Sequence, residues 1–275
     1  MTNLYATLDS IRTYSNIASP NTSDDEVLLS LLNNSSRAIE RFTRRKFYPR
    51  VETRFYDHPK NSQELRLDDD MLALTTLKTQ NGACTVASSV MYLATGREWN
   101  RPPYDKIILS DNSGCTLNYS GTPQRANELT ATWGYHEDYG NAWVDTGTSL
   151  AASYAASGAS LSLAGAGSAG IGASDVDGLA PRIAVGDTLK IDNESFYVLS
   201  GTTSENKTPN VKPYMNGTTA ASHAASAAVY KFSPEPDIEW CAKRLAAWTY
   251  GQKDTPYQSR TVNAALGIVE IELTM

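Results

Sequence analysis

Apolar residues recur at helical spacing at both ends of the chain. Near the start, Leu4, Leu8 and Ile11 predict a short helix. A longer helix is predicted further on, because one face of it collects apolar and small side chains when the residues are placed at about 100° intervals. That face holds Leu28, Leu31, Leu32, Ser35, Ile39 and Phe42. Pro49 is expected to end the element, since the residue before a proline disfavours helix.

The start of the long helix carries a capping-box spacing. Ser23 stands three residues before Glu26, and in this arrangement a hydroxyl and a carboxylate satisfy free amide groups at a helix N-terminus. Asp24 and Asp25 would fall in the first turn, where negative charge suits the helix dipole. We therefore expect Ser23 to cap this helix.

A third helix is predicted near the end of the chain. Pro236 and Asp237 are suited to opening it, and Gly251 to ending it. Trp240 would lie about 160° from the apolar stripe, with Ala247 on the same side, and we expect it either to anchor an interface or to contact a strand layer. The residues of the predicted stripe are Ile238, Cys241, Ala242, Leu245 and Trp248.

Between the helices the pattern changes to the alternation that is typical of strands. Val51, Thr53 and Phe55 alternate with polar residues. Further candidate strands are separated by Asp, Asn, Gly and Pro residues that favour turns. The candidate strands are residues 71–78, 90–94, 106–109 and 129–133, and the turns are residues 68–70, 81–82, 101–103 and 113–114.

The amino-acid composition changes in the next region. From Thr146 to Ser174 there is no charged residue, and almost every side chain is small. Such a segment cannot form a core of its own, so we expect a loop or strands laid against other elements. Residues 188–191 and 196–199 flank Asp192 and Asn193, which predicts a hairpin with a two-residue turn. Residues 229–232 would close this small β-module.

These patterns predict an α+β protein with a discontinuous helical frame. Residues 1–50 and 233–256 would form the helical domain, residues 51–144 an antiparallel β-meander, and residues 145–232 an inserted β-module rich in Ala, Gly, Ser and Thr. Residues 257–275 would form an extended C-terminal docking tail, because a strand pattern near its end has no evident hairpin partner. The apolar positions of that pattern are Ile268, Val269, Ile271 and Leu273.

Charge and composition narrow the classes of function. The net charge is -6 and the sequence pI is about 5.2, which does not favour a general polyanion-binding role. No stretch approaches the roughly 18 apolar residues that cross a bilayer. The first eight residues lack the features of a signal peptide, so we expect the chain to stay where it is made. Cys84, Cys115 and Cys241 are far apart and odd in number, and we expect buried thiols rather than a disulfide or a metal site.

Candidate chemistry is sparse. His58, His136 and His223 lack zinc-site spacing. The acidic residues 68–70 could hold a divalent cation, but an acidic turn before a strand is the favoured interpretation. No hydrolase elbow, phosphate-binding loop or dinucleotide-binding motif occurs. We therefore predict no catalytic, cofactor-binding or metal-binding residues, and we expect that the protein is not an enzyme.

One face of the long helix is basic. Arg37, Arg41 and Arg44 lie opposite its apolar face and are followed by Arg45 and Lys46. Two interpretations stay open. The face is either solvated, with charges that favourably end a helix dipole, or it docks on an acidic neighbour or on DNA phosphates.

The order of these features resembles the head-to-tail connector (adaptor) family of tailed bacteriophages. The resemblance covers residues 24–28 and 37–47 of the long helix and residues 236–254 at the C-terminal helix. Residues 186–191 and 216–224 are similar to β-modules inserted in larger connector proteins, and Trp133-Gly134-Tyr135 at the end of the strand region fits the same pattern. Compact members of the family lack such inserts, so the resemblance implies little about residues 50–232.

The resemblance implies a structural role. Members are wedge-shaped subunits of a ring, here of about twelve copies, which binds beneath the portal protein, extends the DNA channel and carries the tail. The implied partners are other copies of the chain, the portal, a tail terminator or stopper protein, and DNA that passes without sequence-specific binding. No membrane or cofactor is implied. The implied location is the virion neck, with host cytoplasm during assembly.

The residues expected at interfaces or facing the channel come from three segments. They are Arg37, Arg41, Arg44, Arg45, Trp240, Ala247, Ile268, Val269, Ile271 and Leu273. Two alternative functions stay open. One is a tail-side terminator or adaptor protein. The other is a virion protein that binds host carbohydrate through the β-module, with Tyr154, Tyr197 and Tyr214 stacking on sugar rings.

Overall fold

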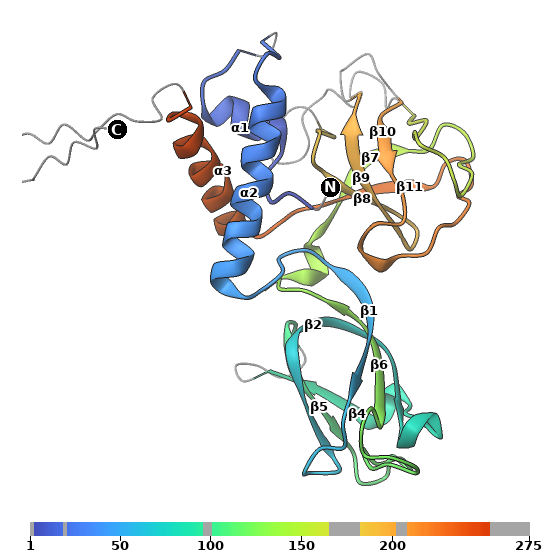
Figure 1. Cartoon of the computed structure of the whole chain (residues 1–275). Helices are drawn as coiled ribbons and strands as arrows, with labels where there is room; N and C mark the ends of the chain where they lie inside the picture. The colour runs from blue at the N-terminus through green and yellow to red at the C-terminus, as the bar shows by residue number, and fades with distance from the viewer. Residues whose placement is uncertain (1–2, 19–20, 96–100, 165–181, 202–207, 254–275) are drawn as a thin grey trace, which may run out of the picture.

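The predicted α+β class is confirmed by a computed structural model of the chain. It describes residues 3–18, 21–95, 101–164, 182–201 and 208–253. Three α-helices and two antiparallel sheets make up this part of the protein. Figure 1 shows the helices beside the second sheet, with the first sheet forming the opposite end of the molecule.

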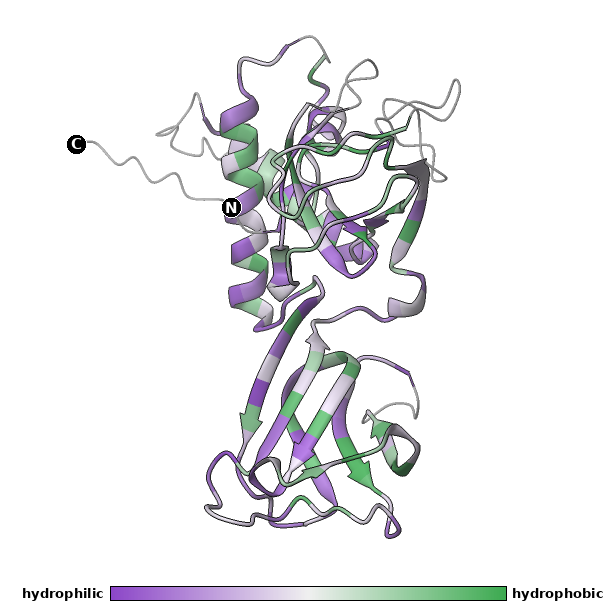
Figure 2. Ribbon diagram, turned by 90° about the vertical axis from the view of Figure 1, so that its right-hand side faces the viewer, coloured by the Kyte–Doolittle hydropathy of each residue, from purple (hydrophilic) through white to green (hydrophobic). Residues whose placement is uncertain are grey.

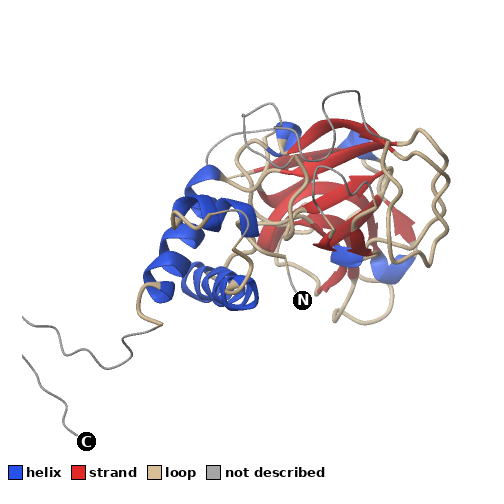
Figure 3. Ribbon diagram, turned by 90° about the horizontal axis from the view of Figure 1, so that it is seen from above, coloured by secondary structure: helices blue, strands red, loops and turns tan. Residues whose placement is uncertain are grey.

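The helical frame combines both ends of the described chain. Its helices are α1 (Leu8–Tyr14), α2 (Asp25–Thr43) and α3 (Pro236–Tyr250). At the end of α3, the Tyr250 hydroxyl donates a 2.6 Å hydrogen bond to Asp24 Oδ2 at the start of α2. The two helices therefore pack antiparallel, and Figure 3 shows all three gathered on one side of the strands.

The first segment of the chain fastens the helices to the second sheet. The Leu8 N–H donates to the Val185 carbonyl oxygen at 3.1 Å, and the Thr188 hydroxyl donates to Asn3 Oδ1 at 2.9 Å. Tyr5 is buried in the frame. The apolar core at this junction consists of Leu4, Tyr5, Ala6, Leu8, Ile11, Leu28, Leu32, Ile39, Phe47, Tyr197, Met215, Ala242 and Ala246.

The boundaries of α2 differ from the sequence prediction. The residue before its first turn is Asp24, and no side chain caps the helix. The predicted cap at Ser23 is therefore wrong, because the Ser23 hydroxyl donates to Asn21 Oδ1 at 2.7 Å instead. The helix ends at Thr43, well before Pro49, because Arg44 adopts a left-handed conformation with φ of 57°.

The first sheet is antiparallel but its strands are not in chain order. The order is β1-β6-β2-β5-β4, with β3 pairing β2. It departs from a simple meander because β6 lies between β1 and β2. The strands are β1 (Arg50–Tyr56), β2 (Glu64–Thr79), β3 (Cys84–Thr85), β4 (Met91–Ala94), β5 (Tyr104–Leu109) and β6 (Asn127–Trp133). Figure 2 shows hydrophobic and hydrophilic positions alternating along several of them, as half-buried strands require.

Two expectations for the first sheet are wrong. The acidic residues 68–70 lie inside β2, which is interrupted by a change of register between Arg66 and Met71. Cys84 and Cys115 form a disulfide. The two cysteines are 31 residues apart, and so long a separation gives no local signal of the pairing. Cys241, expected to be buried, is an exposed free thiol.

The second sheet contains the predicted hairpin. Its order is β10-β9-β8-β11-β7. Ile191 pairs with Glu194, so the turn consists of two residues, and Asp192 has the positive φ that such turns favour. The strands are β7 (Trp143–Ser149), β8 (Thr188–Ile191), β9 (Glu194–Ser200), β10 (Asn210–Lys212) and β11 (Ala228–Phe232).

The segment of small residues lies against this sheet. After β7, isolated bridges join Leu150 to Leu163 and Ser160 to Asn210. The few larger side chains of the segment enter the core of the β-module, so the part up to residue 164 is built into the module. The buried members are Leu150, Tyr154, Leu161 and Leu163.

A glycine permits the contact between the two sheets. The short 3-10 helix Met215–Gly217 packs against β1, and Gly217 has a φ of +75°. A Cβ atom at this position would overlap the Val51 carbonyl oxygen. Both the backbone conformation and the close approach therefore require glycine.

Candidate interaction surfaces

The predicted basic face of α2 is divided by the fold. Arg37 turns inward, where Nη1 lies 2.7 Å from Glu40 Oε1 and Nη2 donates to the Asn3 carbonyl oxygen at 2.6 Å. Its guanidinium carbon lies 5.9 Å from the Tyr5 ring centroid and 6.0 Å from that of Tyr48. Arg37 is therefore part of the frame rather than of a docking face.

Arg45 also has partners within the chain, and it differs in this from Arg41 and Arg44. Arg45 Nε lies 3.0 Å from Asp70 Oδ2, and its guanidinium stacks 4.5 Å from the Tyr135 ring centroid. Arg41 and Arg44 are exposed. Neither forms an ion pair within the part of the chain that the structure describes. The basic surface that is free to meet a partner is thus reduced to these two side chains.

Phe42 lies outside the core, contrary to the sequence prediction. Its side chain is 91% exposed. Ile39 is the last apolar residue of α2 that packs in the frame, and the final turn extends past it. Helical spacing alone cannot show where the packed part of a helix stops, so this residue was assigned to the wrong surface.

The packed face of α3 is rotated by about a quarter turn from the predicted stripe. Ala242 and Ala246 are its fully buried residues. Their small side chains let α2 and α3 approach closely, which a tryptophan in the same place would prevent. Cys241 is exposed and Trp248 is 60% exposed. The prediction that these two residues belong to the apolar stripe in the core is therefore wrong.

Trp240 contacts α1 and remains half exposed to solvent. Its ring meets the Tyr14 ring edge to face, with centroids 5.2 Å apart, and its side chain is 50% exposed. Its aromatic partner is therefore on a helix rather than on a strand. Ala247, predicted on the same side, is partly buried against the frame core. The exposed aromatic pair at this place is Trp240 with Tyr14.

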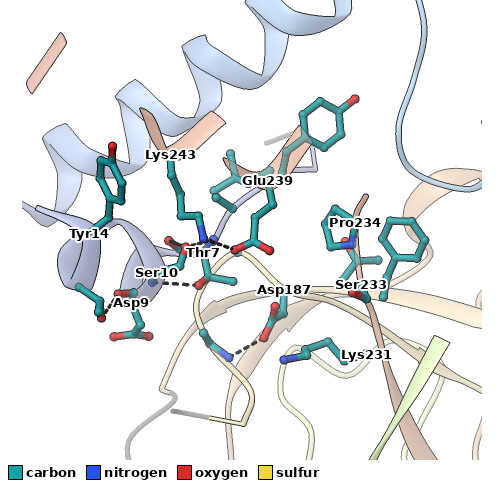
Figure 4. Close-up of a pocket in the computed structure, with 18 of the residues that line it drawn as sticks. Thr7, Asp9, Ser10, Tyr14, Asp187, Lys231, Ser233, Pro234, Glu239 and Lys243 are labelled. Atoms are coloured by element: carbon teal, nitrogen blue, oxygen red, sulfur yellow. Dashed lines mark hydrogen bonds and ion pairs between the residues drawn. The ribbon is translucent and has the colours of Figure 1, made fainter. Parts of the chain in front are cut away.

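A groove of about 400 Å³ opens beside this pair, between α1, α3 and the second sheet. Figure 4 shows charged side chains of both signs around it. Lys243 Nζ lies 2.9 Å from Glu239 Oε1, and the Ala184 N–H donates to Asp187 Oδ2 at 2.7 Å. Burial raises the pKa of the Asp9 carboxyl, and the nearby Arg12 opposes the shift. Charged groups that line the groove therefore already have partners within the fold.

A second, more apolar pocket of about 330 Å³ lies between α2 and β9. Its apolar lining is contributed by the first segment, by α2 and by the hairpin, and polar residues of α2 complete its wall. The apolar residues are Leu4, Leu29, Val185, Tyr197 and Leu199, and the polar ones are Glu26, Ser30 and Asn33. Sequence reasoning missed this pocket because three distant segments form it.

A cleft of about 650 Å³ separates the two sheets and contains His223. His223 Nδ1 lies 2.7 Å from Asp192 Oδ2, and Nε2 lies 3.0 Å from Glu194 Oε2. Glu194 is fully buried and also accepts the backbone N–H groups of Tyr214 and Ala221. The cluster therefore fixes the hairpin to the following loop. Among the described residues, no group of His, Cys, Asp and Glu has the arrangement of a metal site.

The acidic residues 68–70 are neutralised by arginines. Arg54 lies 3.1 Å from Asp68 and 2.9 Å from Asp69, and Arg45 pairs with Asp70 as described above. Arg54 also stacks 3.9 Å from the Trp133 ring centroid. This segment therefore forms a row of ion pairs on the first sheet and is not a free acidic turn.

The residues proposed for sugar stacking are mostly inaccessible. Tyr154 and Tyr197 are buried, and only Tyr214 is exposed. A stacking platform needs open ring faces, so this set cannot form one. The C-terminal tail, with Ile268, Val269, Ile271 and Leu273, lies outside the described residues.

Comparisons with known proteins give no relative. No family model matches the chain, and no similar protein is found among curated sequences or among solved structures. None of the helices described is both long enough and apolar enough to span a membrane.

Proposed function

We propose that this chain is a structural subunit of a head-to-tail connector ring in a tailed bacteriophage. In this role it binds beneath the portal, extends the DNA channel and provides the platform for the tail. The helices that contain most of the residues carrying the resemblance, α2 and α3, lie side by side. Their proximity supports treating them as one functional unit.

The observation that carries the proposal is the exposure of large aromatic side chains on this helix pair. Phe42 lies at the end of α2, and Trp248 lies at the end of α3. Because the helices are antiparallel, these two residues are at opposite ends of the pair. Exposed aromatic residues commonly anchor interfaces, and anchors at both ends suit a subunit that has a neighbour on each side.

The carboxylates near the cavities have partners within the chain. Glu194, Asp187 and Glu239 each have a backbone or side-chain partner that fixes them. A catalytic acid, base or nucleophile instead needs a group aimed at a place where substrate can bind. These carboxylates are therefore assigned to holding the fold.

Reconstitution with the portal protein of the same virus tests the proposal. We expect the purified full chain to form closed rings on the portal, visible by electron microscopy and with a mass measured by light scattering. A double variant, Trp240→Ala with Trp248→Ala, should bind less. A chain that stays monomeric with portal present would overturn the proposal. Rings that form on tail-tube protein but not on portal would identify a tail-side protein instead.

A further inference from the structure

We propose that adjacent copies of this chain join by inserting Phe42 of one copy into the apolar pocket between α2 and β9 of the next. The inference rests on the proposed function, because it names the contact that would build the ring. The occupant of the pocket is thus a second copy of the chain, and the contact is head to tail.

Phe42 has the properties of an inserted anchor. It is 91% exposed, more than any other large apolar side chain that the structure describes. Removing a phenylalanine side chain from water is strongly favourable, because its whole ring is apolar. The helix turn below it is fixed by the packing of Ile39 and Glu40, so little conformational entropy is lost when the ring is buried.

The pocket has the size and the lining to receive this ring. Its volume is about 330 Å³, and a cavity of about 150 Å³ already accepts benzene. Leu29, Val185 and Leu199 supply aliphatic surface, and Tyr197 supplies an aromatic wall. Leu199 is 37% exposed, so apolar surface is accessible from solvent.

Charges around the two features are complementary. Arg41 and Arg44 lie within two residues of Phe42 in sequence, at the C-terminal end of α2, and are exposed. Glu26 lines the pocket and is exposed as well. None of these three forms an ion pair within the described ranges, so all are available to a partner. Such an exposed pair adds little affinity, but it fixes orientation and disfavours wrong partners.

The positions of the two features exclude contact within one chain. Along α2, Phe42 and the centre of the pocket wall formed by residues 26–33 are separated by about 19 Å, and they are about 170° apart around the axis. One copy therefore offers the anchor on one side and the pocket on the other. A contact of this kind is heterologous and repeats from copy to copy, which closes a ring when the rotation is suitable.

Photo-crosslinking tests the contact directly. A photoreactive benzoyl-phenylalanine replaces Phe42 in the full chain, and rings are assembled on portal from a mixture with isotope-labelled wild-type chain. We expect crosslinks from position 42 to peptides of a labelled copy that contain residues 26–33, 185 or 197–199. Rings whose crosslinks reach portal, or another part of a neighbouring copy, would overturn this inference and leave the proposed function standing. Failure to form any ring with wild-type chain would overturn both.

Substitutions provide an independent readout. Phe42→Ala should weaken association between copies at least tenfold, a loss of about 1.4 kcal/mol, without changing the circular dichroism. Tyr92→Ala, at a residue that is 52% exposed on β4, should leave association unchanged. Arg41→Glu with Arg44→Glu should weaken association, and adding Glu26→Arg should restore it. Equal effects of Phe42→Ala and Tyr92→Ala, or no restoration by charge exchange, would count against the contact.

Discussion

The Tyr5 hydroxyl donates a 2.7 Å hydrogen bond to Glu40 Oε1 in the middle of the helical frame. The same hydroxyl accepts a 3.0 Å hydrogen bond from the Phe47 N–H, so one side chain joins the first segment, α2 and the approach to β1. Glu40 also pairs with Arg37 and Lys46. Burial raises the pKa of Tyr5, and the neighbouring Glu40 raises it further.

Removing this hydroxyl should destabilise the frame. Tyr5→Phe leaves the buried Phe47 N–H without its acceptor, and we expect the free energy of unfolding to fall by about 1–3 kcal/mol. Urea titration measures the change. Tyr56→Phe is the matched control, because the Tyr56 hydroxyl bonds to the exposed Asp68; its effect should stay below about 1 kcal/mol. Equal losses would show that Tyr5 does not organise the frame.

Tyr197 should make stability fall at alkaline pH. Burial, followed by the nearby Asp187, raises its pKa to about 12, compared with about 10 in the unfolded chain. The stabilisation is complete below about pH 10 and is lost as the pH rises towards 12, because the unfolded chain releases the proton first. Between about pH 9 and 11, wild type should lose about 1 kcal/mol relative to Tyr197→Phe. Parallel profiles would contradict this assignment.

The disulfide can be tested by counting thiols. Denatured, unreduced protein should react with one equivalent of thiol reagent, at Cys241, and reduction should expose Cys84 and Cys115. Replacing both by alanine should lower the free energy of unfolding by about 2–4 kcal/mol, since the crosslink restricts the unfolded chain. Three reactive thiols before reduction would show that no disulfide forms in the protein.

Gly217 should be intolerant of a side chain. Gly217→Ala combines an unfavourable positive φ with overlap against the Val51 carbonyl oxygen. Gly114 also has a positive φ, of +67°, but a Cβ atom added there would have no other atom within 4 Å. Gly114→Ala therefore isolates the conformational cost of about 1 kcal/mol, and Gly217→Ala should cost clearly more in thermal unfolding. Similar costs would mean that the contact between the sheets relaxes easily.

Local patterns predicted the three helices and several strands, but not β7 or β10, and some of the faces were assigned correctly. The hairpin around Asp192 was predictable because a two-residue turn and its flanking strands are adjacent in sequence. Leu28, Leu32 and Ile39 were placed correctly in the core of α2 by their spacing. In these cases the information lies within one element.

Features that depend on distant segments were not predictable. The face of α3 was misjudged because Ala242 and Ala246 are buried by close helix packing, while the larger Trp248 is excluded. The pocket beside Tyr197 forms only when the hairpin meets α2. Arg37 resembled an exposed charge in the helical pattern, and its partner Asn3 lies 34 residues away.

The arginines of α2 provide the last prediction, because the fold separates those that stabilise it from those that are free. Arg37→Glu would place a carboxylate beside buried Glu40 and remove the bond to Asn3. We expect a loss of about 3–5 kcal/mol, as for a broken buried ion pair. Arg41→Glu with Arg44→Glu should change stability by less than about 1 kcal/mol.

The substitutions should affect ring assembly in the opposite order: those at Arg41 and Arg44 should impair it, and one at Arg37 should not. The folded Arg41→Glu, Arg44→Glu variant should form fewer rings on portal than wild type, because its two exposed charges now repel Glu26 of the neighbouring copy. Arg37→Gln, which avoids adding a negative charge, should assemble at temperatures where it remains folded. Circular dichroism and light scattering on the same samples separate the two effects. Normal ring formation by the double variant would return Arg41 and Arg44 to the role of solvated surface charges.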